Sequence, residues 1–323
     1  MGLLDSKNIP RLPIRCEPIP GESFNGFIAR LAEANLFDKV SWVAEVAKVR
    51  FPQVWYSDDD IERFSRVAGI EFSALRAMAP NQPRQKRDVS VSTSLGHDVP
   101  VDLFARNVRR VCPRCLQESP HHRAIWDLRF VRSCMDHGNR LLAGCPQCGR
   151  FLDWRTRSVQ LCNCNFPLTD EDLSTWMPPV PVGTIKGPRY LQAMLHGIEQ
   201  PIPNLLVGLD FDETYDLLWR FGYFGSNRST FNLDDSVKPE VEIWLTRGLE
   251  LLSKEAMDLQ RILMRRATST RGGAKKKEFA LLTKVQAALK EMSPRAAPLE
   301  EVVGAVLSGL VSPEGNSTRE VVV

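Results

Sequence analysis

Four short segments decide the fold at the centre of this chain: Cys112-Pro-Arg-Cys115, Cys134-Met-Asp-His137, Cys145-Pro-Gln-Cys148 and Cys162-Asn-Cys164. They contain seven of the eight cysteines, which together with one histidine make eight ligands for a metal. Thiolate and imidazole bind zinc tightly, and four such ligands complete one tetrahedral site. The segments therefore predict two structural zinc ions per chain, with Cys112, Cys115, Cys134, His137, Cys145, Cys148, Cys162 and Cys164 as ligands.

Sequential pairing of these ligands is favoured because each half of the region is locally complete: four ligands precede residue 138 and four follow residue 144. A cross-braced arrangement, in which the two halves exchange ligands, is the alternative. His121 and His122 compete with His137 as ligands, although no cysteine lies at knuckle spacing from either. Disulfides are the other interpretation of the cysteines, and a reducing compartment disfavours them.

Complete ligand sets indicate a structural role for the metal, since no position stays open for a catalytic water. Gly138 and Gly149 each follow a ligand pair and suit the left-handed turn that a metal knuckle needs. A segment with many loops and few large apolar groups depends on metal binding for part of its stability. Its larger apolar residues, expected to pack between the two sites, are Trp126, Leu128, Phe130 and Trp154.

Helical patterns precede the cysteine region. Ser23 is expected to cap a helix whose apolar residues recur at spacings of three and four, and a short helix follows near Trp42. Another helix begins at Ser57 and is separated by Gly69 from the next one, which is the outline of a helix-turn-helix. The stretch 83–111 is polar, and we expect it to be partly loop-like.

Helical patterns also follow the cysteine region. Expected helices lie near 171–176 and 189–198, from a capping box of Asp210 and Glu213 onward, over 239–263 and over 278–292. The stretch 261–277 contains seven basic residues, no acidic residue and two adjacent glycines, which predicts a flexible basic connector. The end of the chain is expected to be helical around 299–310 and disordered over 312–323.

These patterns predict a mainly α fold in four parts: a helix-turn-helix-like N-terminal domain (1–110), two zinc-binding knuckle or ribbon modules with short β-hairpins (111–166), a C-terminal helical domain (167–292) and a partly disordered tail (293–323). The composition, with 43% hydrophobic and 25% charged residues, is ordinary for a globular protein. No apolar run approaches the roughly 18 residues that span a bilayer. Residues 1–10 lack a signal-peptide pattern, so a cytoplasmic protein is expected.

The net charge of +3 is too small for strong non-specific binding of nucleic acid, so such contact must come from local patches. Arg76, in the second helix of the glycine-linked pair, is the clearest candidate for reading a base. Candidates for phosphate contact are Arg106, Arg109, Arg110 and Arg114 near the first knuckle, and Arg265, Arg266, Lys275, Lys276 and Lys277 in the later basic stretch. A plain packing helix, a solvated basic surface and a soluble linker are the respective alternatives.

The order and spacing of several segments resemble the TniQ/TnsD family of transposition proteins. The likeness covers about residues 18–166 and includes Pro18-Ile-Pro-Gly-Glu-Ser23, Phe27-Ile-Ala-Arg-Leu-Ala32, Asn35, Cys112-Pro-Arg-Cys-Leu116, Trp126, Cys134-Met-Asp-His-Gly138 and Cys145-Pro-Gln-Cys-Gly149. Met135 departs from the proline that the family commonly has after this cysteine, which loosens a turn without removing a ligand.

The resemblance implies a bacterial target-selection adaptor that recruits the transposon's AAA+ regulator, which then brings the transposase for DNA integration. Some such proteins bind DNA directly, whereas others dock on a CRISPR RNA-guided surveillance complex in CRISPR-associated transposons. Whether the chain forms a homodimer stays open. A sequence-specific DNA-binding regulator with a supporting zinc region is the alternative function. We expect no enzyme, because the sequence has no HExxH, Walker lysine loop or GxSxG motif.

Overall fold

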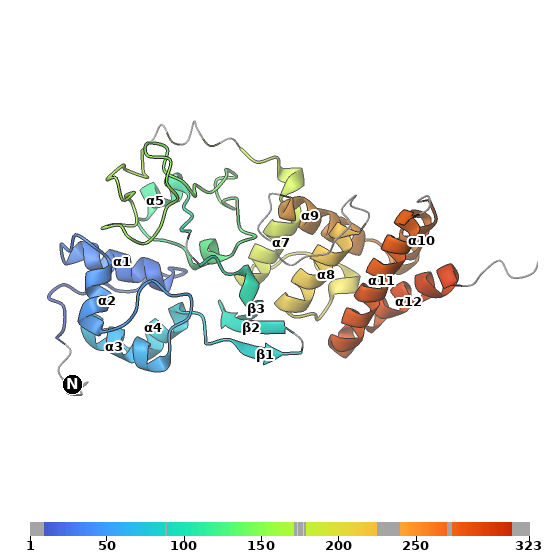
Figure 1. The fold of residues 1–323 in the computed structure, drawn as a ribbon, viewed down its shortest axis with the longest axis horizontal. Coiled ribbons are helices and arrows are strands. Elements are labelled where there is room, and N and C mark those ends of the chain that lie inside the picture. The colour runs from blue at the N-terminus through green and yellow to red at the C-terminus, as the bar shows by residue number, and fades with distance from the viewer. Residues whose placement is uncertain are drawn as a thin grey trace, which may run out of the picture. The chain divides into compact units, whose positions relative to one another are not determined.

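The protein is mainly α-helical in its computed structural model (Figure 1), which confirms the predicted fold class, and two Cys/His clusters fit the predicted double zinc module. The structure describes residues 10–87, 89–106, 108–170, 173, 177, 179–224, 240–269 and 273–311, without the side chains of 269, 273–278 and 311. The chain divides into two compact units, which are Met1–Ile185 with Gln192–Gly197, and Lys186–Leu191 with Ile198–Val323.

Four helices form the N-terminal part of the first unit: α1 (Phe24–Ala34), α2 (Ser41–Ala47), α3 (Asp58–Ala68) and α4 (Phe72–Met78). Ser23 caps α1 as predicted, since its Oγ accepts a hydrogen bond from the N–H of Gly26 at 3.0 Å. Ser57 and Asp60 form a capping box for α3, and Gly69 ends that helix with a φ of +68°. The four helices share a core that includes Phe27, Ile28, Phe64 and Leu75.

A three-stranded antiparallel sheet follows, in the order β1 (Arg84–Lys86), β2 (Val89–Ser94) and β3 (His97–Pro100). The expectation of a partly loop-like stretch over 83–111 missed this sheet. The strands are short and polar, and although Val91 and Val99 are fully buried, they show little of the alternation that indicates a strand. Leu95 and Gly96 join β2 to β3 with positive φ values of 52° and 80°, as a tight hairpin turn requires.

Turns and short pairings build the cysteine region around α5 (Pro113–Glu118), with 3-10 helices η2 (Val101–Leu103), η3 (Ala124–Asp127) and η4 (Val182–Thr184) nearby. Isolated antiparallel bridges join Ser133 to Arg140, Gly144 to Phe151 and Leu161 to Pro167. Trp126, Leu128 and Phe130 are buried. Trp154 belongs to the same hydrophobic core as the N-terminal helices, so the second knuckle packs against those helices.

The second unit consists of helices: the start of α7 (Lys186–Leu195), then α8 (Phe211–Tyr223), α9 (Val241–Leu252), α10 (Ala256–Ser269), α11 (Gly273–Glu291) and α12 (Ala297–Val311), with 3-10 turns η5 (Asn204–Leu206) and η7 (Pro294–Ala296). The capping box of Asp210 and Glu213 expected for α8 is present. Helices α8 and α9 cross closely: a Cβ atom on Gly248 would lie 1.8 Å from the carbonyl oxygen of Leu218.

Two predictions for the C-terminal half are wrong. The single helix expected over 239–263 is two helices, because α9 ends at Leu252 and α10 begins at Ala256. The flexible connector expected over 261–277 is mostly helical, within α10 and α11. Apolar residues recur at helical spacing on both sides of residues 253–255, so the sequence pattern alone did not show that the helix is interrupted there. The expected helix near 171–176, apart from Leu173, and the expected disorder over 312–323 lie outside the described residues.

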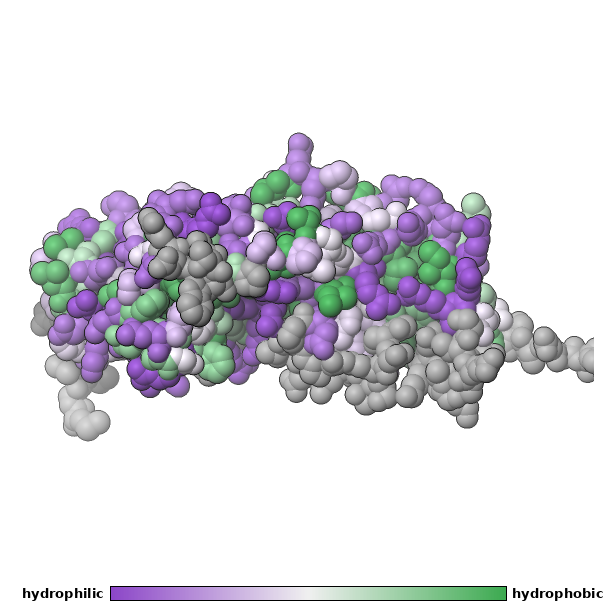
Figure 2. Space-filling view, turned by 90° about the horizontal axis from the view of Figure 1, so that it is seen from above, coloured by the Kyte–Doolittle hydropathy of each residue, from purple (hydrophilic) through white to green (hydrophobic). Residues whose placement is uncertain are grey.

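The surface mixes residues of opposite hydropathy. On the face drawn in Figure 2, hydrophilic residues predominate and hydrophobic residues form separate small groups. Within the described part of the chain, every helix is too short or too polar to span a bilayer.

Candidate metal centre

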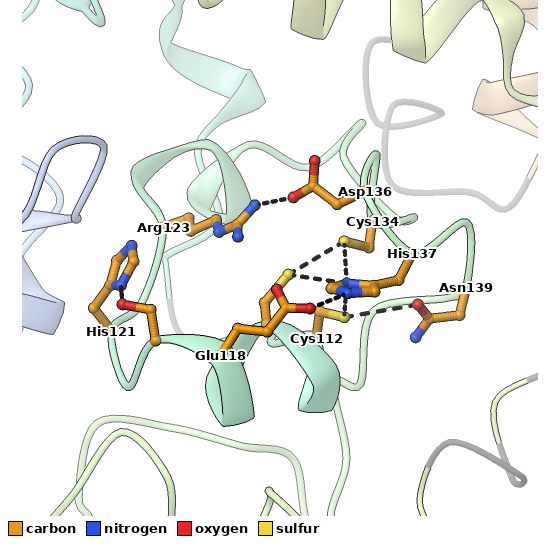
Figure 3. Close-up of polar contacts among 10 residues, drawn as sticks. Cys112, Glu118, His121, Arg123, Cys134, Asp136, His137 and Asn139 are labelled. Carbon is orange, nitrogen blue, oxygen red and sulfur yellow. Dashed lines mark hydrogen bonds and ion pairs between the residues drawn. The ribbon is translucent and has the colours of Figure 1, made fainter.

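The first cluster contains Cys112, Cys115, Cys134 and His137, whose ligand atoms all lie within 4.8 Å of one another (Figure 3). The Sγ atoms of Cys115 and Cys134 are 3.4 Å apart, and Nδ1 of His137 lies between 3.3 and 3.5 Å from the three sulfurs. A tetrahedral zinc ion with Zn–S bonds of about 2.3 Å separates its ligand atoms by about 3.5–3.8 Å. The observed spacing is therefore close to that of one bound ion.

The second cluster contains Cys145, Cys148, Cys162 and Cys164, whose sulfurs also lie within 4.8 Å of one another. The sulfurs of Cys145 and Cys164 are 3.6 Å apart, and those of Cys148 and Cys162 are 3.7 Å apart. These distances match the edge of a tetrahedral thiolate site and are far longer than a disulfide bond. All eight cysteines, each within the described residues, are free thiols.

Local backbone turns bring each pair of ligands together. The N–H of Gly138 donates to the carbonyl oxygen of Cys134 at 2.9 Å, and the N–H of Gly149 donates to that of Cys145 at 2.9 Å. Both glycines adopt the left-handed conformation, with φ of +66° and +69°, as their positions in the sequence predicted. Cys112 and Cys115 instead lie at the N-terminal end of α5.

A carboxylate orients the histidine ligand. Nε2 of His137 lies 2.8 Å from Oε1 of Glu118, at the end of α5, while Nδ1 faces the sulfurs (Figure 3). This hydrogen bond favours the tautomer that leaves Nδ1 free to bind a metal. Oδ1 of Asn139 lies 3.6 Å from the sulfur of Cys112 on the other side of the cluster. Sequence analysis did not identify Glu118, although its position three residues after Cys115 places it one helical turn away.

The surroundings of two cysteines favour the thiolate, which is the form that binds zinc. Hydrogen bonds from the thiols of Cys115 and Cys134 lower the pKa of Cys112 to about 3. Hydrogen bonds from the backbone and side chain of Arg150 lower the pKa of Cys148 to about 6. In the same clusters, hydrogen bonding to Cys112 raises the pKa of Cys115, and burial raises the pKa of Cys145 and Cys162, so an incoming cation must displace protons from these thiols.

The two rival histidines lie outside both clusters. Nδ1 of His121 lies 2.9 Å from Oγ of Ser119, and Nδ1 of His122 lies 2.8 Å from Oγ of Ser23. His122 is fully buried between the rings of Trp126 and Trp154, and this burial holds its pKa well below the usual range. The eight candidate ligands are grouped sequentially in the structure, with His137 as the histidine of the first cluster.

The segment 18–23 docks on the loop that separates the two halves of the first cluster. The N–H of Ser23 donates to the carbonyl oxygen of His122 at 2.7 Å, and the N–H of Ala124 donates to that of Gly21 at 2.8 Å. The buried carboxylate of Glu22 forms an ion pair with Arg30 of α1 at 2.8 Å. This segment therefore holds the start of α1 against the metal-binding region.

Two of the arginines expected to meet phosphates are structural. Arg109 is 1% exposed and donates to the carbonyl oxygens of Val159 and Leu161, both at 2.8 Å. Arg110 donates to the carbonyl oxygens of Arg129 and Val131. Burial lowers the pKa of both arginines to about 10, so they stay charged at neutral pH. Both guanidinium groups are therefore enclosed by the protein and are not accessible to a phosphate group.

The remaining candidates differ in how far they reach solvent. Arg76 is held at the end of α4, where it donates to the carbonyl oxygens of Tyr56 and Ala79 and to Oδ1 of Asn81. Arg106, Arg114 and Arg265 are exposed, and Arg266 is half-buried. Lys275, Lys276 and Lys277 lie in α11, and their side chains are outside the described residues. Within the first unit, the candidates that are exposed to solvent are therefore Arg106 and Arg114.

The family model described as TniQ matches residues 13–141, which contain the segment 18–23 and the first cluster but not the second. None of the curated proteins matches the chain.

Proposed function

Because the chain belongs to the TniQ/TnsD family of transposition proteins through its domain at residues 13–141, we propose that it is a non-catalytic target-selection adaptor. In this role it connects a target-recognition element to the transposon's AAA+ regulator, and through that regulator to the transposase. The target-recognition element is a CRISPR RNA-guided complex or a DNA site. The family match is the observation that carries this proposal.

The metal clusters support the adaptor role. In both clusters four protein ligands enclose one position, so a bound ion has no site left for a reacting water. We propose zinc as the metal, since three thiolates with one imidazole, or four thiolates, at these distances suit a tetrahedral ion. Zinc would stabilise the turns of the cysteine region, which then presents a fixed surface to partners.

Metal analysis of the purified full-length protein tests this part. We expect about two zinc ions per chain. Cys115→Ser and Cys148→Ser should each lose about one ion, because they remove a ligand from different clusters. Cys16→Ser is the matched control, since Cys16 lies outside both clusters and should keep both ions. A metal-free protein with an unchanged melting curve would contradict the zinc proposal.

Co-purification tests the adaptor role itself. The tagged full-length chain is expressed with the products of its neighbouring genes, and bound proteins and RNA are identified after washing. We expect recovery of an AAA+ ATPase, and recovery of a guide RNA with its proteins would identify RNA-guided targeting. Absence of any transposition protein from repeated, cross-linked purifications would refute the adaptor proposal.

A DNA-binding regulator is the second candidate, and two exposed arginines favour it. Arg114 lies between Cys112 and Cys115 of the first cluster, and Arg106 precedes Cys112 by six residues in the sequence; both are exposed to solvent, unlike Arg109. Binding of a duplex by the chain alone should then weaken with salt, and each phosphate contact contributes a slope of about 0.9 in a log–log plot. Arg114→Ala should reduce that slope, whereas an unchanged slope would exclude this residue from the interface.

A further inference from the structure

The two cysteine clusters differ in how far their sulfurs reach solvent. In the first cluster all three cysteines are enclosed, with at most 2% of their surface exposed. In the second cluster two cysteines are enclosed, whereas Cys148 and Cys164 are partly exposed. A small reagent in water can therefore reach a sulfur of the second cluster in the folded protein, but the first cluster must open before its sulfurs are reached.

The second cluster is open because it lies between two turns at the surface. Pro146, Gln147 and Gly149 are exposed beside the first pair of ligands, and Asn163 is exposed beside the last ligand. Oε1 of Gln147 lies 3.8 Å from the sulfur of Cys164, but the glutamine is itself exposed and can turn aside. In contrast, α5 carries Glu118 over the histidine of the first cluster.

Each partly exposed sulfur has an enclosed sulfur as its neighbour. The sulfur of Cys148 lies 3.7 Å from that of Cys162, and the sulfur of Cys164 lies 3.6 Å from that of Cys145. A disulfide bond is about 2.0 Å long, so either pair could close by a shift of about 1.7 Å within its two turns. The cluster thus combines an accessible thiol with a second thiol that can react with it.

We propose that the second cluster is a site of oxidative modification, at which a hydroperoxide converts its cysteines to disulfides and expels the metal. The inference rests on the zinc proposed for both clusters and goes beyond it, because it assigns a different reactivity to each. Oxidation of cysteines is selective for thiolates that solvent reaches. The segment between Cys148 and Cys162 carries Trp154, so the modification lies next to a residue of the N-terminal core.

The reaction needs one peroxide for each disulfide. The thiolate of Cys148 attacks one peroxide oxygen, the O–O bond breaks, and the sulfur becomes a sulfenic acid while the other oxygen takes up a proton and leaves as water. The thiolate of Cys162 then attacks this sulfur, so that the S–S bond forms, the S–O bond breaks and a second water leaves after protonation. Two thiolates lose two electrons, the peroxide gains them, and the metal loses two ligands. A second peroxide reacts at Cys164 and Cys145 in the same way.

Zinc release from the zinc-loaded full-length protein tests the proposal, with hydrogen peroxide as the oxidant and a chromophoric chelator as the detector. We expect two phases of about one ion each, the first at least about tenfold faster, because the other cluster must open before it reacts. The rate measured without peroxide is subtracted. Free thiols are trapped with N-ethylmaleimide at the end of the fast phase, and mass spectrometry should then find the disulfides Cys148–Cys162 and Cys145–Cys164.

Three variants assign the phases to the clusters. Cys115→Ser should keep the fast phase and lose the slow one, whereas Cys148→Ser should keep only the slow phase, since each variant removes a ligand of a different cluster. Cys16→Ser is the matched control, because Cys16 is also partly exposed but lies outside both clusters, and both phases should be unchanged. The disulfide map of the wild type needs no variant, so it decides the question even where a variant does not fold.

Three results would overturn the proposal. The first is release of both ions at one rate, and the second is the appearance of oxidised Cys112, Cys115 or Cys134 before any disulfide of the second cluster. The third is oxidation confined to Cys16. A protein purified without zinc would contradict the zinc proposal alone, because the disulfide map would still show which cysteines react first.

Discussion

Arg109→Met is the change that best separates a structural arginine from one that binds nucleic acid. Arg109 is fully buried, and its guanidinium donates to two carbonyl oxygens at 2.8 Å and to that of Ser158 at 3.4 Å. The guanidinium also lies over the ring of Trp154, with its central carbon 5.6 Å from the ring centre. Methionine keeps much of the volume but donates no hydrogen bond. The carbonyl oxygen of Val159 would lose this donor, whereas those of Ser158 and Leu161 would keep the hydroxyl of Thr156 as a donor.

The magnitude follows from these contacts. Hydrogen bonds to charged groups contribute about 1.5–3 kcal/mol each, and the two short bonds therefore bring a gross loss of about 3–6 kcal/mol. Removal of the charge saves part of its desolvation cost, so we expect a net loss of about 3 kcal/mol. In a unit of this size, each kcal/mol lost from the free energy of unfolding lowers the melting temperature by about 2–4 °C. The variant should melt about 10 °C below the wild type.

Differential scanning fluorimetry of zinc-loaded protein measures this shift, and urea denaturation measures the free energy of unfolding. Arg114→Met is the matched control, because Arg114 is exposed and should change stability by less than about 0.5 kcal/mol. The reasoning is refuted if Arg109→Met melts with the wild type yet loses affinity for DNA. That result would mean that Arg109 reaches phosphate in solution.

Three further predictions concern the candidate metal site, the start of α1 and Asp127 at the end of η3. Glu118→Ala should lower zinc affinity at the first cluster by about tenfold, because it removes the acceptor on Nε2 of His137; competition with a chromophoric chelator measures this, and equal affinity would exclude the role of Glu118. Ser23→Ala should destabilise the protein by about 2 kcal/mol in urea denaturation, since it removes both the cap of α1 and the partner of His122; a loss below about 0.5 kcal/mol would contradict this. The melting temperature of Asp127→Asn minus that of the wild type should increase as the pH rises from about 4 to 7. The reason is that the folded-state pKa of about 7 exceeds the ordinary value, so the wild type progressively loses stability over this window; a constant difference in melting temperature would refute it.

The two Cys/His clusters were predictable from the sequence because the signal is local. The spacing of Cys112 and Cys115, or of Cys145 and Cys148, fixes two ligands within one turn of chain, and the glycine that follows a pair shows where the backbone turns. The helix starts at Ser23 and Ser57 were predictable for the same reason, since a cap acts on N–H groups three residues away.

Burial of individual arginines was not predictable in this way. Arg109 and Arg114 lie five positions apart on either side of Cys112 and have the same chemistry, yet one is enclosed and the other is exposed. The difference arises from carbonyl groups about fifty residues further along the chain, which surround only Arg109. The three-stranded sheet was missed for a related reason. Val91 of β2 pairs with Pro100 of β3, and this pairing depends on the neighbouring strand, which the residue pattern of β2 does not indicate.

The contacts of the segment 18–23 explain why this N-terminal stretch and the first cluster occur in one domain. Eighteen residues separate Cys115 from Cys134, and a loop of that length has no fixed course from metal binding alone. Two hydrogen bonds attach the middle of this loop to the segment before α1: the N–H of Ser23 donates to His122, and the N–H of Ala124 donates to Gly21. The ion pair of Glu22 with Arg30 then fixes the segment to α1 itself.

His122 extends this connection to the second knuckle, because its buried ring contacts Trp154, which lies in the core of the N-terminal helices. Metal release from either cluster would therefore loosen contacts that α1 depends on, and unfolding of α1 would free the loop between the ligands. We therefore expect the two parts to unfold together, although they are separate motifs in the sequence. For an adaptor, such coupling gives a rigid body whose surfaces keep their relative positions when different partners bind.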